Sequence, residues 1–151
     1  MFGLTTSIGE GNMTLKIGNV HMFFAYHMRS ASLKSESALR EALNEWNLSL
    51  DHFYVLRCDW KPEGASLDEI TAHSMLTRQD ASQALADLIV KNCVSKGSKD
   101  GFYSLSPQGS MLRNQTLEAY QVYIAKLTDG LSDKVIETAL SSLLTVQNNI
   151  Q

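Results

Sequence analysis

The chain has 151 residues, 44% of them apolar and 19% charged, which is typical of one globular domain with a sizeable hydrophobic core and excludes disordered and fibrous proteins. Its net charge of -3 provides no overall attraction to nucleic acid. Any contact with phosphate must therefore come from a local basic patch, which dimerisation could help to assemble.

The first 13 residues, MFGLTTSIGEGNM, contain no basic residue and no continuous apolar run, so we expect a flexible N-terminus and no secretory signal. No apolar run elsewhere approaches the length of a membrane span. We therefore expect a cytoplasmic protein without membrane contact. Two cysteines, Cys58 and Cys93, are too few for a disulfide framework and too far apart for a CxxC site, and we interpret them as reduced thiols.

Residues 15–46 contain no proline, and their apolar residues recur at steps of three and four. This spacing predicts either one long helix or two helices joined near Ser35. The apolar stripe consists of Ile17, Val20, Phe24, Met28, Ala31, Leu39, Leu43 and Trp46.

Three shorter helices are predicted next. Ser49 is a plausible N-cap for a helix with Leu50, Phe53, Leu56 and Trp60 on one face, and KPEG ends that helix by turn chemistry. Ser66 and Glu69 have the spacing of a capping box, in which each side chain binds the other residue's free backbone N–H, and the helix they open ends near His73.

Thr77 and Asp80 repeat the capping device, and the helix that follows turns Ala81, Ala84, Leu85 and Leu88 inward before Asn92 stops it in a left-handed conformation. The segment CVSKGSKDGFYSLS then predicts a β-hairpin with a tight turn at Asp100 and Gly101.

Two more helices complete the chain. Ser106 as N-cap and Pro107 at the first helical position begin a helix that stops at Gly130. The last helix runs from Ser132 to about Gln147 with a broad apolar stripe. The first and last helices lie outside the compact middle, and a second copy of the chain could cover their stripes.

Three helices followed by a two-stranded ribbon are the arrangement of a winged helix-turn-helix. In this motif the second helix of the helix-turn-helix enters the major groove. With a helix on either side, residues 15–146 resemble the MarR family of bacterial transcription regulators. The resemblance rests on four phrases in the right order: NLSLDHFYVL, SLDEITAHSMLT, LIVKNCVSK and YSLSPQG.

The resemblance implies a mainly α fold with a two-stranded wing and a homodimer. Residues 14–151 would form a single domain, with dimerisation helices in 14–47 and 107–151 and a winged-helix DNA-binding head in 48–106. Thr77–Lys91 would be the recognition helix and Cys93–Leu105 the wing. The positions that match the family's DNA-facing residues are Thr77, Arg78, Gln79, Ser82, Gln83 and Lys96. Lys99 lies at the tip of the wing, where it could also meet phosphate or the minor groove.

The implied partner is double-stranded DNA, bound at an inverted repeat. Arg78, Gln79, Ser82 and Gln83 have the chemistry to read bases, because arginine pairs with guanine, glutamine pairs with adenine and serine suits either. Thr77, Lys96 and Lys99 would contact the backbone. Two or three lysines per subunit predict modest binding that weakens with salt.

The chain departs from the family in its wing, where GSKDGF is shorter than usual and lacks the family's Asp-x-Arg pair. Between positions 61 and 105, five basic residues stand against six acidic ones, whereas a DNA-binding head is normally basic. The alternative is therefore a degenerate winged helix with little or no DNA binding that works through protein contacts. Neutralising Arg78, Lys96 and Lys99 would separate the two hypotheses.

Family members often bind small, frequently aromatic and acidic ligands between the dimerisation helices and the head. The candidate lining residues are Tyr26, His27, Trp46, His52 and Tyr54, although aromatic residues at helical spacing more often fill a core. No enzyme signature, zinc spacing or cofactor motif occurs, so we expect no catalytic residues, no metal site and no cofactor.

Overall fold

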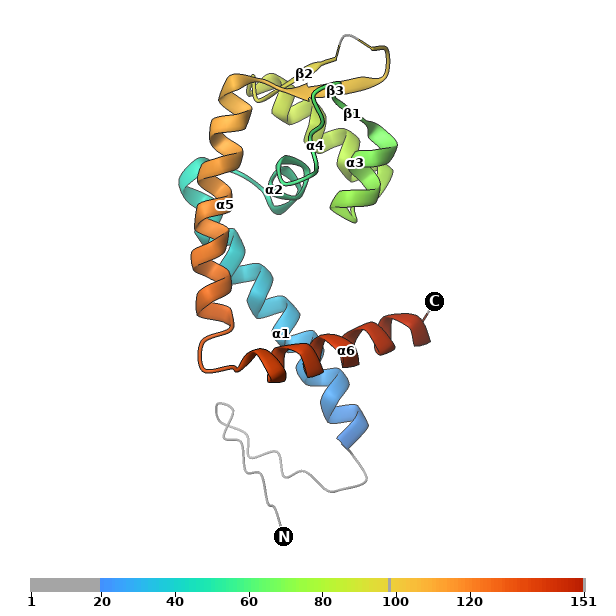
Figure 1. Ribbon diagram of the computed structural model, residues 1–151, viewed down its shortest axis with the longest axis vertical. Helices are drawn as coiled ribbons and strands as arrows, with labels where there is room; N and C mark the ends of the chain where they lie inside the picture. The colour runs from blue at the N-terminus through green and yellow to red at the C-terminus, as the bar shows by residue number, and fades with distance from the viewer. Residues whose placement is uncertain (1–19, 98, 151) are drawn as a thin grey trace. The chain divides into compact units, whose positions relative to one another are not determined.

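The computed structural model describes residues 20–97 and 99–150, which form helices and a small sheet (Figure 1). The predicted flexible segment 1–13 lies outside the described residues, as do the first residues of the predicted long helix. The chain forms two compact units, Met1–Ala38 and Leu39–Gln151. Its division into a head at 48–106 and flanking dimerisation segments stays a prediction.

One continuous helix, α1 (Val20–Leu43), is formed where the sequence left open one helix or two. A 3-10 turn, η2 (Asn44–Trp46), follows it and ends at Asn47 in the left-handed region. Leu39 and Leu43, near the end of α1, are buried in the core of the second unit. Apolar side chains of the first unit, among them Phe24 and Met28, are exposed to solvent.

The second unit contains α2 (Leu50–Leu56), α3 (Leu67–Ser74) and α4 (Arg78–Val90), and each of them begins at a predicted N-cap. The Ser66–Glu69 capping box is confirmed, because each side chain binds the other residue's backbone N–H. The predicted capping box of Thr77 and Asp80 is formed only in part. Thr77 Oγ1 accepts from the Asp80 N–H, but the Asp80 carboxylate accepts from the Thr77 hydroxyl and not from its backbone N–H.

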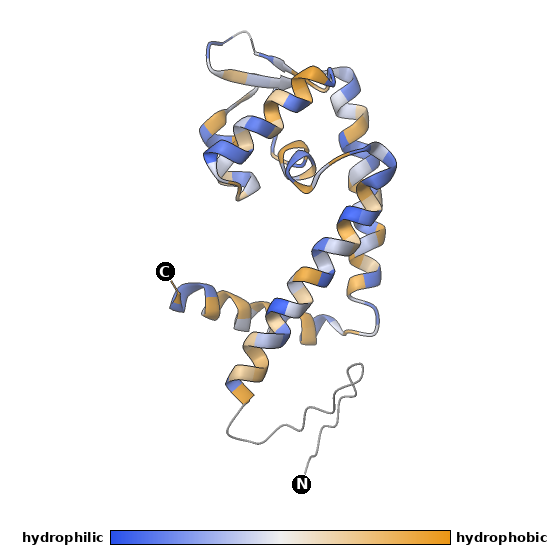
Figure 2. Cartoon of the chain, turned by 180° about the vertical axis from the view of Figure 1, so that it is seen from behind, coloured by the Kyte–Doolittle hydropathy of each residue, from blue (hydrophilic) through white to orange (hydrophobic). Residues whose placement is uncertain are grey.

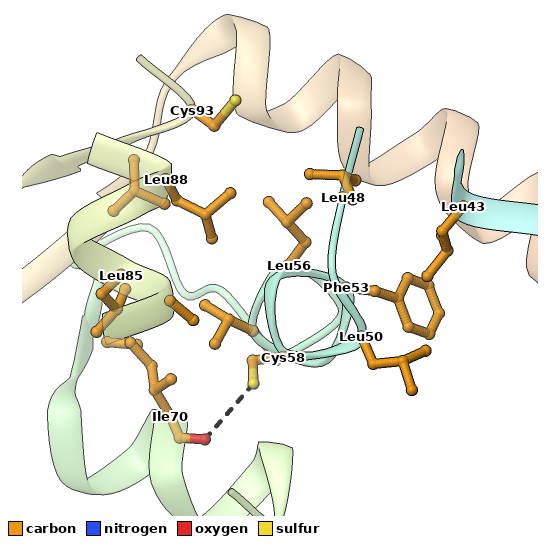
Figure 3. Close-up of a cluster of buried hydrophobic side chains, with 14 of the residues drawn as sticks. Leu43, Leu48, Leu50, Phe53, Leu56, Cys58, Ile70, Leu85, Leu88 and Cys93 are labelled. Atoms are coloured by element: carbon orange, nitrogen blue, oxygen red, sulfur yellow. Dashed lines mark hydrogen bonds between the residues drawn. The ribbon is translucent and has the colours of Figure 1, made fainter. Parts of the chain in front are cut away.

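The core of the second unit gathers apolar side chains from α2, α3 and α4, together with Leu43 at the end of α1 (Figure 3). Phe53, Leu56, Ile70 and Leu88 are completely buried. Fully burying side chains of this size contributes about 1.5–3 kcal/mol each, so the core fixes the positions of the three helices.

The predicted helix that was to carry Trp60 ends earlier, at Leu56. Trp60 follows in the connecting segment, where its indole Nε1 donates to the carbonyls of Leu56 at 3.1 Å and Val55 at 3.3 Å. The Trp60 side chain therefore binds the last carbonyls of α2 from the connecting segment while it packs against the core.

The sheet has three antiparallel strands in the order β1-β3-β2, where the sequence predicted two. The predicted hairpin forms β2 (Val94–Lys96) and β3 (Phe102–Leu105), with Val94 opposite Leu105. The unpredicted strand β1 (Ala65–Ser66) pairs Ala65 with Tyr103. It joins the segment before α3 to the wing and thus ties the wing to the helix-turn-helix.

Two helices follow the sheet, α5 (Pro107–Leu127) and α6 (Asp133–Asn149). Ser106 is the N-cap of α5 as predicted, and Ser132, the predicted start of the last helix, precedes α6 without a side-chain cap bond. No residue of α6 is buried, although hydrophobic residues recur along it (Figure 2). Among the described residues, no helix combines the length and the apolarity that crossing a bilayer requires.

Candidate nucleic-acid interface

The helix α4 buries one side and presents the other to solvent. Ala81, Ala84, Leu85 and Leu88 are buried at steps of three and four, as the sequence predicts. The predicted base-reading residues all lie on the exposed part of the helix; they are Arg78, Gln79, Ser82 and Gln83. The chain therefore presents four polar side chains on a helix that the core holds rigidly.

A tight turn of Met75, Leu76 and Thr77 joins α3 to α4. Met75 has a φ of 58°, in the left-handed region, and is 88% exposed. Thr77 is the N-cap of α4 and is exposed at the end where the free backbone N–H groups make the helix attractive to anions. Two helices joined by a three-residue turn constitute a helix-turn-helix.

The side chain of Arg78, at the first position of α4, is held in an ion pair. Its Nη1 donates to Oδ1 of Asp68, which lies in the first turn of α3. The side chains remain 65% and 79% exposed, and exposed pairs contribute only about 0–1 kcal/mol. Arg78 can therefore leave Asp68 for a base or a phosphate at a small cost.

Gln83 and Asp87 lie one turn apart on α4 and are hydrogen-bonded. Gln83 Nε2 donates to Asp87 Oδ1 at 2.9 Å, and the other carboxylate oxygen of Asp87 lies 3.4 Å from Nε2 of His52. His52, on α2, is only 9% exposed. This connection between a buried histidine and a glutamine that is predicted to read bases had no signal in the sequence, because 35 residues separate the histidine from the aspartate.

The wing carries the two predicted lysines. Lys96 ends β2 and is exposed, and it makes no ion pair among the described residues. Lys99 places its Nζ 4.1 Å from the centre of the Phe102 ring, a cation–π contact. The contact orients the Lys99 ammonium group at the tip of the hairpin while leaving it exposed.

A second ion pair reduces the basic character of the head further. Lys61 Nζ lies 2.7 Å from Oε1 of Glu69. The hydrogen bond from Lys61, together with those from Ser66, lowers the pKa of Glu69 to about 2. Of the basic residues between positions 61 and 105, Lys61 and Arg78 are thus paired. The others, Lys91, Lys96 and Lys99, have no acidic partner within the part of the chain that the structure describes.

The five residues proposed to line a ligand pocket divide between the two units. Tyr26 and His27 lie on α1, with their ring centres 5.2 Å apart. Trp46 and Tyr54 pack against the core of the second unit. His52 completes a capping box with Ser49, because its Nδ1 accepts from the Ser49 N–H at 3.1 Å. A shared pocket of the five residues stays a prediction.

A cleft of about 480 Å³ lies elsewhere in the second unit, between the segment after α2, the end of β3 and the start of α5. Trp60, Lys61, Ser104 and Arg113 are among its lining residues, and none of the five predicted residues is. The guanidinium Nε of Arg113 donates to the Leu56 carbonyl at 3.0 Å. Arg113 and Trp60 in this lining thus both bind carbonyls at the end of α2.

The two cysteines are buried free thiols, as predicted. Burial raises the pKa of the Cys58 thiol to about 11 and also raises the pKa of Cys93. Both thiols are protonated at neutral pH and are poor nucleophiles. Within the described ranges, no three His, Cys, Asp or Glu side chains gather in a way that could hold a metal ion.

No family model matches the chain, and no curated protein does. Solved structures resemble it over most of its length. A MarR-family transcriptional regulator from Silicibacter pomeroyi is 24% identical, with a TM-score of 0.69, over 89% of this chain and 96% of that one.

Two further similar structures belong to proteins that bind or respond to a small molecule. CouR from Rhodococcus jostii RHA1, bound to p-coumaroyl-CoA, has a TM-score of 0.72 at 15% identity, over 82% of this chain and 90% of that one. BpsR from Bordetella bronchiseptica, whose DNA binding is regulated by 6-hydroxynicotinic acid, has a TM-score of 0.68 at 16% identity, over 83% and 98%. The chain therefore has the winged helix-turn-helix fold of the MarR-family transcription regulators.

Proposed function

We propose that this protein is a sequence-specific DNA-binding transcription regulator that acts in the cytoplasm as a homodimer. The observation that carries the proposal is the exposed side of α4. It presents Arg78, Gln79, Ser82 and Gln83 from a helix-turn-helix whose opposite side is fixed in the core. The shared fold with MarR-family regulators supports the same conclusion.

Each exposed residue has a role that its chemistry allows. Arg78 would pair with O6 and N7 of guanine, the two glutamines would read adenine, and Ser82 would accept or donate to either kind of base. Thr77, Lys96 and Lys99 would hold phosphates and so set the position of α4 along the groove.

Dimerisation would explain the apolar side chains that the second unit leaves exposed. Val135, Leu140, Leu143 and Leu144 on α6 are each at least 42% exposed, although they follow helical spacing. Two-fold pairing of such surfaces removes them from water. A symmetric dimer would present two α4 helices to half-sites about one helical turn apart, so the operator would be an inverted repeat.

A small aromatic acid is the ligand class that the similar structure of BpsR favours, because 6-hydroxynicotinic acid regulates the DNA binding of that protein. In our proposal it would bind at Tyr26, His27, Trp46, His52 and Tyr54. Regulation by such a ligand requires different affinities for the DNA-bound and free forms. A rise in melting temperature with 6-hydroxynicotinic acid that disappears in Tyr26→Ala would support this pocket, and an unchanged melting temperature would oppose it.

Hydroxyl-radical footprinting of the region upstream of the protein's own coding sequence tests the DNA-binding function. We expect two protected segments about one helical turn apart, and their loss in Arg78→Ala. Uniform cleavage at low salt, with a protein that is folded by circular dichroism, would contradict the proposal.

The pairing of Arg78 with Asp68 and of Lys61 with Glu69 favours a second candidate, a winged helix that binds another protein. Such a module needs no net positive charge on its head. The lysines distinguish the two candidates, since Lys96→Ala and Lys99→Ala should each reduce the salt dependence of DNA binding by about one counterion. A protein-binding module would show no DNA affinity to reduce.

A further inference from the structure

The amide of Gln83 has its nitrogen and its oxygen in different surroundings. The nitrogen donates to Asp87 Oδ1 at 2.9 Å, whereas the oxygen has no hydrogen-bond partner among the described residues. An ionised carboxylate accepts hydrogen bonds and cannot donate them, so only the nitrogen side of the amide can face Asp87. Asp87 therefore turns the carbonyl oxygen of Gln83 away from itself.

Asp87 is in turn held by His52 on α2. The Ser49 N–H donates to Nδ1 of His52, so in the neutral ring the proton is on Nε2. That N–H points at Asp87 Oδ2, 3.4 Å away. His52 is itself fixed because it is 9% exposed and because Ser49 Oγ accepts its backbone N–H at 3.2 Å.

We propose that His52 and Asp87 are positioning residues that make Gln83 a reader of an exocyclic amine, preferably that of adenine. The inference rests on the proposed DNA-binding function. The outward carbonyl oxygen accepts from adenine N6 or cytosine N4, and the second N–H of the amide is free to donate to adenine N7. Guanine and thymine present an acceptor, O6 or O4, opposite the amide oxygen, so they lose this hydrogen bond and bind more weakly than adenine.

Selection of bound duplexes from a random-sequence library, with the full chain at low salt, tests the inference. We expect the wild type to prefer adenine at one position of each half-site, by about 5- to 100-fold over guanine. Gln83→Ala should abolish the preference at that position and leave the other positions unchanged.

Asp87→Asn is the decisive variant. The amide that replaces the carboxylate can donate to the Gln83 oxygen as well as accept from its nitrogen, so the Gln83 amide becomes free to turn over. We expect guanine or thymine to be accepted at the same position. Asp100→Asn, at the wing tip, is the matched control: it removes the same charge and should raise affinity for all sequences without changing any base preference.

His52→Gln tests whether His52 holds Asp87 in place. Glutamine at this position of a capping box can still accept from the Ser49 N–H, so the fold should persist, but its side chain no longer anchors Asp87. We expect a weaker preference for adenine at the Gln83 position. An unchanged preference would remove His52 from the proposal.

The outcomes separate this inference from the function on which it rests. If the wild type enriches no sequence, the DNA-binding function itself fails. If the wild type enriches a motif but Asp87→Asn selects the same bases as the wild type, the positioning role is overturned while the regulator remains. A motif that Gln83→Ala does not alter would overturn the reading role of Gln83.

Discussion

Replacing Gly109 by alanine tests how closely α5 packs on the base of the wing. Gly109 is the third residue of α5, and its N–H donates to Ser106 Oγ at 2.9 Å. A Cβ built on Gly109 would lie 1.9 Å from the carbonyl oxygen of Cys93 and 2.8 Å from its carbonyl carbon. Both are backbone atoms, so no side-chain rotation can relieve the clash.

The expected loss can be worked out from these contacts. Ordinary van der Waals contact begins near 3.4 Å, so α5 and Cys93 would have to separate by about 1.5 Å. Overpacking of this kind costs about 1–3 kcal/mol, and stretching the 3.0 Å bond from Ser106 N–H to Cys93 O adds about 1 kcal/mol. The better helix propensity of alanine offsets about 1 kcal/mol. Gly109→Ala should therefore destabilise the fold by about 1–3 kcal/mol.

Urea unfolding followed by far-ultraviolet circular dichroism measures this loss. We expect a lower midpoint with an unchanged slope, since the surface exposed on unfolding stays the same. Gln108→Ala, at the exposed neighbouring position of α5, is the matched control and should change the stability by less than about 0.5 kcal/mol. A midpoint for Gly109→Ala equal to or above that of the wild type would refute the reasoning.

Three further predictions concern association, DNA affinity and acid stability. Leu140→Glu, at a site on α6 that is 55% exposed, should produce a monomer in sedimentation velocity and weaken DNA binding, whereas Ser142→Glu on the other side of α6 should do neither. Asp68→Asn should release Arg78 and raise DNA affinity in anisotropy titrations, with a stability loss below about 1 kcal/mol. Glu69 has its pKa lowered to about 2 from 4.5, so its contribution to stability is present above pH 4.5 and is lost as the pH falls toward 2. The melting temperature of Glu69→Gln should therefore vary less than that of the wild type across this range.

Each of these predictions has a result that would oppose it. A dimeric Leu140→Glu would show that α6 is not the interface. Unchanged DNA affinity in Asp68→Asn would show that Asp68 does not compete with DNA for Arg78. Parallel acid melting curves for Glu69→Gln and the wild type would show that the Lys61 hydrogen bond does not affect folding.

Much of the fold could be predicted from the sequence because its signals are local. Ser49, Ser66 and Ser106 were predicted as N-caps, and each side chain accepts a backbone N–H three residues on. Capping depends on bonds within one turn, so it can be recognised from spacing. Gly109, in the phrase YSLSPQG, stands out as a glycine inside a helix, and the close approach of Cys93 explains it.

Features that depend on distant parts of the chain could not be predicted in this way. The strand β1 has only two residues, and its pairing of Ala65 with Tyr103 is decided by how the helices bring the wing near. Trp60 follows the spacing of the α2 face, but the helix ends before it, at Leu56, and its indole binds the last carbonyls from the connecting segment.

In the candidate interface too, local features could be predicted from the sequence and long-range contacts could not. The periodicity of α4 predicts which of its side chains are exposed, and Arg78 and Gln83 are among them. The hydrogen-bond partners of Arg78 and Gln83 are harder to predict from the sequence. Asp68 lies ten residues before Arg78, on another helix, and His52, whose predicted place in a ligand pocket stays a prediction, also caps α2 and reaches Asp87.

Fluorescence anisotropy with the chain's own upstream duplex and a scrambled duplex, at near-physiological salt, tests the DNA-binding account most directly. We predict that the upstream duplex binds tighter by on the order of 1,000-fold or more, and that Arg78→Ala and Gln83→Ala each reduce this ratio. Lys99→Ala should weaken binding to both duplexes alike. Equal affinities for the two duplexes, unaffected by all three substitutions, would contradict the account.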